Sequence, residues 1–164
     1  MTPRDLVLTP TGVRFMGRHV PATIGRGGVS MDKREGDGAT PKGTHKIVGM
    51  LYRPDRLAKP ASWAVPIGLN DLWCDDPAHE DYNLMVSAPF AASHETLRRS
   101  DPMYDVILIT DWNWPFARKG LGSAIFLHQW RRRCGTTEGC VAFSRSYLLW
   151  ICARLKYDSK LIVA

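Results

Sequence analysis

A histidine and a cysteine in neighbouring segments are the residues whose types could do chemistry together. His128 ends the apolar run 123–128, and Cys140 lies in the segment 136–143 that follows a basic, turn-rich excursion. A cysteine attacks acyl carbons as a thiolate, and an imidazole beside it can take the thiol proton. The pair predicts covalent acyl transfer, although a buried cysteine beside a satisfied histidine would give the same pattern.

The residues around this pair offer the other parts of such a site. Gly139 lets the backbone bend before Cys140, so N–H groups there could hold a tetrahedral oxyanion. A nucleophile's base is usually oriented by a third group. Either the carbonyl of Gln129 or the hydroxyl of Thr137 could orient His128 in that way.

The elements that must position the pair are mostly strands. Residues 5–25 alternate loosely and predict a small antiparallel meander, and 44–52, 104–110, 123–128 and 160–164 predict further strands. The near-continuous β-branched run 104–110 indicates a central, buried strand. Eleven prolines and fourteen glycines also favour a β-rich fold over a helical bundle.

Two helical segments are expected. Ser144 is a good N-cap for a helix over 145–156, whose apolar residues, Cys152 among them, recur at helical spacing and predict a buried face. Ser93 is a plausible cap for a short helical segment over 95–99. The rest of 53–104 is loop-rich, aromatic and acidic, and predicts binding loops that wall a groove. His45 is expected on a strand surface.

Composition limits the class of protein. The chain of 164 residues predicts a single domain, 1–164, and its net charge of +6 suits an anionic partner. Its basic residues form no aromatic-interleaved stripe of the kind that binds single strands, so nucleic acid is not the expected partner. Its four cysteines form no C-x-x-C motif.

The N-terminal residues and the hydropathy of the chain bear on its location. The first residues contain no apolar stretch of the length that a secretory signal needs, and no window is apolar enough for a membrane span. If Met1 is the native start, the protein is expected in the cytoplasm. A trimmed chain would instead be compatible with the periplasm. The sequence does not indicate an oligomeric state.

Two blocks of sequence resemble the L,D-transpeptidase (YkuD-type) catalytic domain family. In that family a strand ends in histidine and a Ser/Thr-His-Gly-Cys-x-Arg motif follows, which corresponds here to 126–128 and to 137–142. Upstream, 36–43 resembles the family's Gly-Asp-x-x-Thr-Pro-x-Gly stretch. The blocks occur in the family's order, and the similarity covers roughly residues 5–164, as in a short branch of the family.

The resemblance implies a β-sandwich-like fold with one or two helices, one of them C-terminal to the nucleophile. It also implies thioester chemistry on peptidoglycan stem peptides or muropeptides, with no metal or cofactor. Cys140 would attack the third-residue carbonyl and expel the terminal D-alanine, and His128 would act as base and then as acid. Gly139 and Thr137 would complete the catalytic set.

This sequence departs from the family motif at two positions. Glu138 stands where the motif has a second histidine, and Ala142 stands where it has the arginine that helps to organise the substrate's charged groups. Three cations could replace the arginine. The candidates are His94, Arg131 and Lys42. Candidate substrate-binding residues are His94, Arg131, Glu138 and Trp114.

The gap between His128 and Cys140 is shorter than usual in the family, which would favour small acyl acceptors such as water. Cross-linking takes place outside the cytoplasmic membrane, so a cytoplasmic member would more sensibly trim soluble muropeptides. We therefore expect an L,D-carboxypeptidase-like activity.

Two other classes of function stay open at this point. A zinc hydrolase could use His128, Cys134 and Cys140 as ligands, although their spacing matches no common zinc pattern. A domain without catalysis could bind cell wall or nucleic acid through its positive charge.

Overall fold

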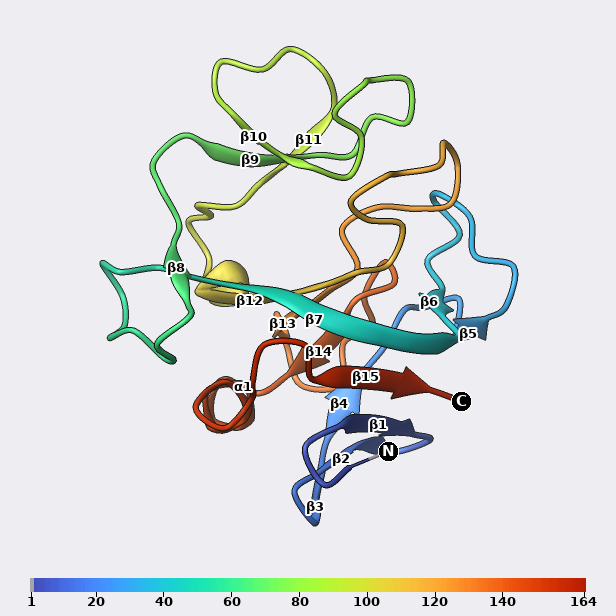
Figure 1. Cartoon of the computed structure of the whole chain (residues 1–164), viewed down its shortest axis with the longest axis vertical. Coiled ribbons are helices and arrows are strands. Elements are labelled where there is room, and N and C mark those ends of the chain that lie inside the picture. The colour runs from blue at the N-terminus through green and yellow to red at the C-terminus, as the bar shows by residue number, and fades with distance from the viewer. Residues whose placement is uncertain (1) are drawn as a thin grey trace.

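The computed structural model describes residues 2–164, and strands dominate it (Figure 1). The strands are β1 (Leu6–Thr9), β2 (Gly12–Phe15), β3 (Arg18–Val20), β4 (Ala22–Thr23), β5 (Val29–Ser30), β6 (Thr40–Pro41), β7 (Gly43–Tyr52), β8 (Val65–Pro66), β9 (Asp71–Cys74), β10 (Met85–Ser87), β11 (His94–Thr96), β12 (Val106–Thr110), β13 (Phe126–Gln129), β14 (Val141–Phe143) and β15 (Lys160–Val163). The helical elements are a 3-10 helix, η1 (Pro102–Tyr104), and an α-helix, α1 (Arg145–Cys152). The predicted mainly β fold, with a helix C-terminal to Cys140, is confirmed.

One curled sheet forms the body of the molecule. It has ten strands in the order β3-β2-β1-β15-β7-β12-β13-β14-β4, with β8 paired to β7 beside this path. The two ends of that order, β3 and β4, are consecutive in the chain, so the sheet bends round until its ends nearly meet. Two small sheets, β10-β9-β11 and β5-β6, lie outside it.

The long strand β7 joins the two halves of the curled sheet (Figure 1). Its first residues, 43–46, pair with β15, and its last residues, 47–52, pair with β12. The next neighbours are β13, antiparallel to β12, and β14, parallel to β13. Because β14 begins directly after Cys140, this parallel pair brings the nucleophile segment beside the strand that carries His128.

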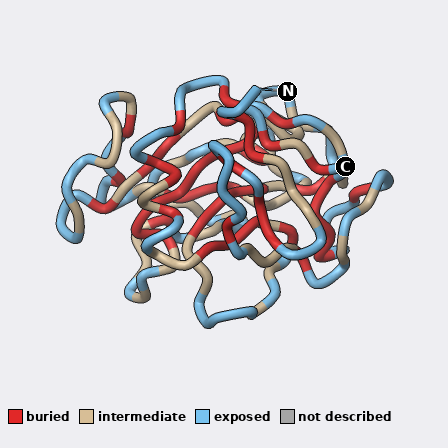
Figure 2. Tube along the Cα trace, turned by 90° about the horizontal axis from the view of Figure 1, so that it is seen from below, coloured by how far each residue is buried: buried red, intermediate tan, exposed pale blue. Residues whose placement is uncertain are grey.

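Side chains alternate between the two faces of these central strands. On β12, Val106 and Leu108 belong to a first apolar cluster, which also packs on α1. Ile107 and Ile109 belong to a second cluster, which includes Phe126 of β13. The buried residues accordingly run through the middle of the molecule, with exposed loops around them (Figure 2). Both faces of the central strands are covered, as the continuous apolar run 104–110 predicts.

The predicted helical segment over 95–99 is wrong. His94–Thr96 is strand β11, which pairs antiparallel with β9 through His94 opposite Cys74 and Thr96 opposite Leu72. Within it Glu95 is half-buried and Leu97, just beyond its end, is fully buried, a spacing of two that suits a strand. Pairing with a strand more than twenty residues away decides this segment, and no local pattern reports such a pairing.

Three further expectations are corrected in detail. His45 is buried rather than on a strand surface, with a ring nitrogen 3.0 Å from the carbonyl oxygen of Pro41. Helix α1 begins after Ser144, as predicted, but ends at Cys152. The strand expected over 123–128 begins only at Phe126. Among residues 2–164, no helix is long and apolar enough to cross a membrane.

Candidate active site

His128 is a buried side chain on the central strand β13. Its backbone pairs with Ile107 on one side and with Ala142 on the other. Nδ1 lies 2.8 Å from the carbonyl oxygen of Gln129. Because a carbonyl only accepts, Nδ1 carries the proton and Nε2 is the basic nitrogen. Of the two groups predicted to orient this imidazole, the Gln129 carbonyl is the one in contact.

The surroundings of His128 favour the neutral ring. Burial lowers the pKa of His128 to about 4, the Gln129 carbonyl acting in the opposite direction and the positive charge of Arg99 in the same direction. The imidazole is therefore a free base at neutral pH.

Cys140 lies directly before β14. Its thiol contacts the backbone of Ala124, which precedes β13, and of Phe126, the first residue of β13. Sγ donates to the carbonyl of Ala124 at 3.1 Å and accepts from the N–H of Phe126 at 3.4 Å. Burial raises the pKa of Cys140 to about 12, and the nearby Glu95 carboxylate adds to this, while the Phe126 N–H opposes it. The resting site consequently holds a neutral thiol and a neutral imidazole rather than an ion pair.

The loop before Cys140 is held from two directions. The hydroxyl of Thr40 donates to the carbonyl of Gly139 at 2.8 Å and accepts from the N–H of Gly25 at 3.0 Å. The carbonyl of Thr137 accepts from the N–H of Arg26 at 2.8 Å. The two blocks of sequence that resemble the family motif are thus joined directly beside Cys140.

Asp37 organises the turn that carries Thr40. Its carboxylate accepts from the Lys33 ammonium at 2.6 Å and from the N–H groups of Arg34 and Ala39 at 2.7 and 2.8 Å. Burial raises the pKa of Asp37, but these hydrogen bonds outweigh it and hold the pKa below its usual value. A fixed anion here explains why the turn can bury the Lys33 ammonium.

Cys140 and His128 open into the same cavity, whose volume is about 620 Å³. The side chains that line it carry both signs of charge, and they come from the turn near Glu35, from the long connection 53–104 and from the segment 123–140 that includes β13. The lining residues are Glu35, Asp75, Glu95, Arg99, Met103, Tyr104, Ser123, Ala124, His128, Trp130, Arg131, Arg132, Gly135, Thr136, Thr137, Glu138 and Cys140.

The predicted residues of the nucleophile loop have defined contacts. Thr137 Oγ1 donates to the carbonyl of Cys140 at 2.6 Å and accepts from the N–H of Gly139 at 3.2 Å. Thr137 therefore shapes the loop, and the Gly139 N–H is engaged within it, so the oxyanion role of Gly139 stays a prediction. Glu138 is exposed, and its carboxylate lies 3.0 Å from the guanidinium of Arg26.

Among the predicted substrate-binding residues, Arg131 and Glu138 line the cavity and two others do not. His94 is exposed, with Nδ1 2.7 Å from the carbonyl oxygen of Ala92. Trp114 is half-buried and packs against the second apolar cluster. Lys42, a candidate replacement for the motif arginine, also lies outside the lining residues.

Sequence reasoning missed Tyr104, Glu95 and Arg99, which lie close to the His–Cys pair. The ring centroid of Tyr104 is 5.4 Å from that of His128, and its hydroxyl is 3.4 Å from a carboxylate oxygen of Glu95. Burial raises the pKa of Glu95, and the Asp75 carboxylate raises it further. The aromatic and acidic loops of 53–104 gave a general signal for a groove wall, but not these positions.

The zinc site considered from the sequence has no matching cluster of ligands. Within residues 2–164, no group of three or more His, Cys, Asp or Glu side chains is arranged to hold a metal ion.

Comparison with known proteins identifies the domain. The family model of the YkuD L,D-transpeptidase catalytic domain matches residues 7–163, almost the whole chain. No curated protein and no solved structure matches this chain. The match spans both sequence blocks and includes His128 and Cys140, which line the cavity. The chain therefore belongs to the L,D-transpeptidase catalytic domain family.

Proposed function

We propose that Cys140 forms a thioester with the third residue of a peptidoglycan stem peptide and releases the terminal D-alanine. The observation that carries the proposal is that the Cys140 thiol and the His128 imidazole line one cavity, with Nε2 of His128 left as the basic nitrogen. Membership of the family supports peptidoglycan peptides as the class of substrate.

The neutral resting pair determines how the first step proceeds. The pKa of Cys140 is raised to about 12 and that of His128 is lowered to about 4, so the neutral pair is favoured over the ion pair before the substrate binds. The thiol proton moves to Nε2 as Sγ attacks the carbonyl carbon. The C–N bond then breaks, and the same proton passes from His128 to the leaving amine.

We further propose that water resolves the thioester, which makes the protein an L,D-carboxypeptidase. His128 removes a proton from water, the resulting hydroxide attacks the thioester carbon, and the C–S bond breaks as Sγ takes the proton back. The net reaction converts a tetrapeptide and water into a tripeptide and D-alanine. The short connection 129–139 between the two residues supports a small acceptor, and an amine acceptor would instead give transpeptidation.

The test is incubation of the purified protein with a tetrapeptide muropeptide, followed by mass spectrometry of the products. Tripeptide and free D-alanine are expected. Cross-linked or amino-acid-exchanged products alone would contradict the carboxypeptidase, and no product of either kind would contradict the thioester chemistry.

Two cysteine variants make a matched pair for this experiment. Cys140→Ala is expected to abolish product formation, because it removes the nucleophile. Cys134→Ala changes an exposed cysteine that lies outside the cavity lining and is expected to leave the product yield unchanged. Acylation by a carbapenem, seen as an increase in intact mass, should likewise occur in Cys134→Ala and be absent in Cys140→Ala.

A further inference from the structure

The family's motif arginine is missing here, because the uncharged Ala142 stands at its position. Ala142 is fully buried and lies directly opposite His128 in the parallel pair β13–β14. A charged side chain there would lie in the core next to the base. A cation that binds the charged groups of the substrate must therefore come from another segment.

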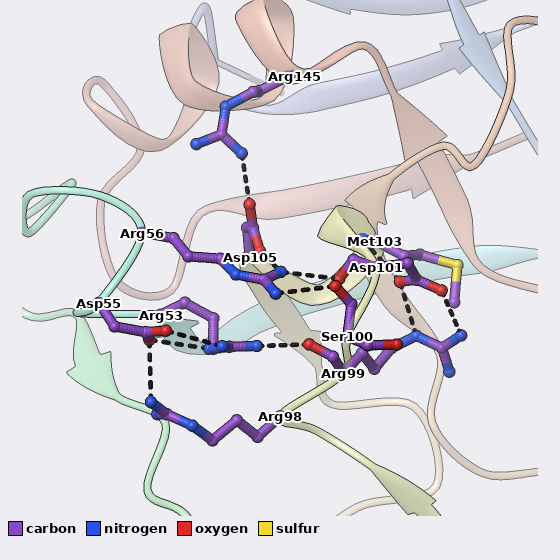
Figure 3. A network of polar contacts seen from close by, with 10 residues as sticks. All are labelled: Arg53, Asp55, Arg56, Arg98, Arg99, Ser100, Asp101, Met103, Asp105 and Arg145. Carbon is purple, nitrogen blue, oxygen red and sulfur yellow. Dashed lines mark hydrogen bonds and ion pairs between the residues drawn. The ribbon is translucent and has the colours of Figure 1, made fainter.

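Arg99 reaches the cavity from the connection between β11 and β12. Its Nε and Nη2 donate to the two carboxylate oxygens of Asp101 at 2.9 and 2.6 Å, a bidentate geometry. Asp101 also accepts from the N–H of Met103, which fixes the carboxylate at the start of η1. Figure 3 shows this pair, with the third nitrogen of Arg99, Nη1, turned away from Asp101.

The held guanidinium lies close to the reacting pair. Its central carbon lies 5.4 Å from the ring centroid of Tyr104, and the Tyr104 ring lies edge-on to His128 with centroids 5.4 Å apart. Tyr104 is thus shared between Arg99 and the base. Burial is the larger influence on the pKa of both His128 and Glu95 and leaves that of Glu95 raised, but the positive charge of Arg99 acts on both groups in the lowering direction.

A second guanidinium borders the same part of the cavity. Nη2 of Arg131 lies 3.9 Å from the Asp101 carboxylate, and 71% of the Arg131 side chain is exposed. Asp101 thus faces two cations, and the Glu95 and Asp75 carboxylates line the same cavity. Arg131 is free to move toward a ligand, whereas Arg99 is fixed in place.

We propose that Arg99, together with Arg131, binds the C-terminal carboxylate of the acyl-donor peptide and makes the enzyme specific for donors that end in a free carboxylate. The inference rests on the proposed function, in which the scissile bond is the last peptide bond of the donor. That carboxylate is then one residue from the carbon that Cys140 attacks. Guanidinium groups bind carboxylates through directed N–H donors, and Nη1 of Arg99 is available for this.

The experiment compares two donors that differ only at the C-terminus, a tetrapeptide muropeptide and its C-terminal carboxamide. The unmodified protein is expected to process the carboxylate donor with a kcat/KM roughly 10-fold to 100-fold higher, the range for losing one charge-assisted hydrogen bond. Arg99→Gln should reduce this ratio to near one by slowing only the carboxylate donor. Arg99→Lys, which keeps the charge, should retain part of the preference.

Arg98→Gln is the matched control. Arg98 and Arg99 are about equally exposed and each pairs with an aspartate, Arg98 with Asp55 (Figure 3). Arg98 also donates to the Ile67 carbonyl and is not among the residues that line the cavity. A loss of folded protein in either variant would lower kcat/KM by the same factor for both donors and would leave their ratio unchanged. Preference for the carboxylate donor should survive in Arg98→Gln and disappear in Arg99→Gln.

Binding separates this inference from the proposed function. Calorimetry of the two donors with Cys140→Ala, and with Arg99→Gln in that background, measures the same preference without turnover. Absence of D-alanine release by the unmodified protein would contradict the proposed function. Equal affinity for the two donors, or a preference unchanged by Arg99→Gln, would overturn the role of Arg99.

Discussion

The hydroxyl of Thr40 donates to the carbonyl of Gly139 at 2.8 Å, which joins two segments that lie 99 residues apart in the chain. The same hydroxyl accepts from the N–H of Gly25, so a single buried side chain ties three segments together. The residue after Gly139 is Cys140, the proposed nucleophile. The position of Cys140 thus depends on a turn near the start of the domain.

Replacing Thr40 by valine keeps the shape of the side chain but removes both hydrogen bonds. The buried carbonyl of Gly139 and N–H of Gly25 would lose a partner, so the free energy of unfolding should fall by about 1–3 kcal/mol. Carbapenem acylation of Cys140 should also slow, because the loop before it is less well held. Urea denaturation and time-resolved intact-mass measurement test the two effects.

Thr44→Val is the control for this substitution, since Thr44 lies on β7 with an exposed side chain. It should change neither the unfolding free energy by more than about 0.5 kcal/mol nor the acylation rate. Equal behaviour of the two valine variants would show that the Thr40 bonds do not position Cys140.

Gly25 is required because two backbones approach it closely. A Cβ at this position would lie 2.1 Å from the carbonyl oxygen of Gly38 and 2.8 Å from the Cα of Gly139. Both neighbours are backbone atoms, so Gly25→Ala must separate the two blocks of the site. We expect less folded protein and at least a tenfold loss of acylation rate, which corresponds to roughly 1.4 kcal/mol in the barrier.

Gly135→Ala provides the comparison for Gly25→Ala. Its Cβ would lie 2.9 Å from Cγ of Arg132, an exposed side chain that can move away, and 3.2 Å from the carbonyl oxygen of Arg132, a much looser approach than at Gly25. Thermal unfolding of this variant should resemble that of the unmodified protein. A Gly25→Ala protein with the same melting temperature and acylation rate would contradict the close approach.

The sequence predicted that His128 and Cys140 share a site, from two blocks that resemble the family, and both residues line one cavity. It also predicted the strands beside them, because strands leave local patterns. The run 104–110 is apolar and β-branched throughout, and His128 ends the next apolar run. The sequence did not predict Arg99 or Glu95, because their places depend on β11 pairing with β9 across the loop-rich connection. The helical interpretation of 95–99 arranged these two side chains with the roughly 3.6-residue period of a helix instead of the two-residue period of a strand. It therefore did not predict that both reach the cavity.

The raised pKa of Cys140 predicts a slow thiol in the resting enzyme. The thiolate is the reactive form toward iodoacetamide, and burial keeps the pKa of this thiol at about 12. Cys134 is exposed and should be alkylated first, with Cys140 at least tenfold slower. Peptide mapping after timed quenching distinguishes the two sites. Preferential early labelling of Cys140 at neutral pH would mean that the pair rests as thiolate and imidazolium.

The lowered pKa of His128 predicts how stability and activity depend on pH. The folded protein holds the neutral ring down to about pH 4, whereas in the unfolded chain the ring takes a proton near 6.5. Between these values the unfolded state binds more protons, so His128 contributes stability that is present above pH 6.5 and is lost as the pH falls toward 4. For one such group the slope approaches roughly 1.4 kcal/mol per pH unit.

The difference between the unmodified protein and His128→Gln isolates this contribution. Urea denaturation at several pH values should show the unmodified protein losing stability faster than the variant below pH 6.5, while His19→Gln, at an exposed position, should follow the unmodified protein. The acidic limb of kcat/KM should accordingly lie near pH 4 rather than near 6.5, because Nε2 stays free to accept the thiol proton. An acidic limb near 6.5 would mean that the imidazole is solvated, and the neutral resting pair would then be wrong.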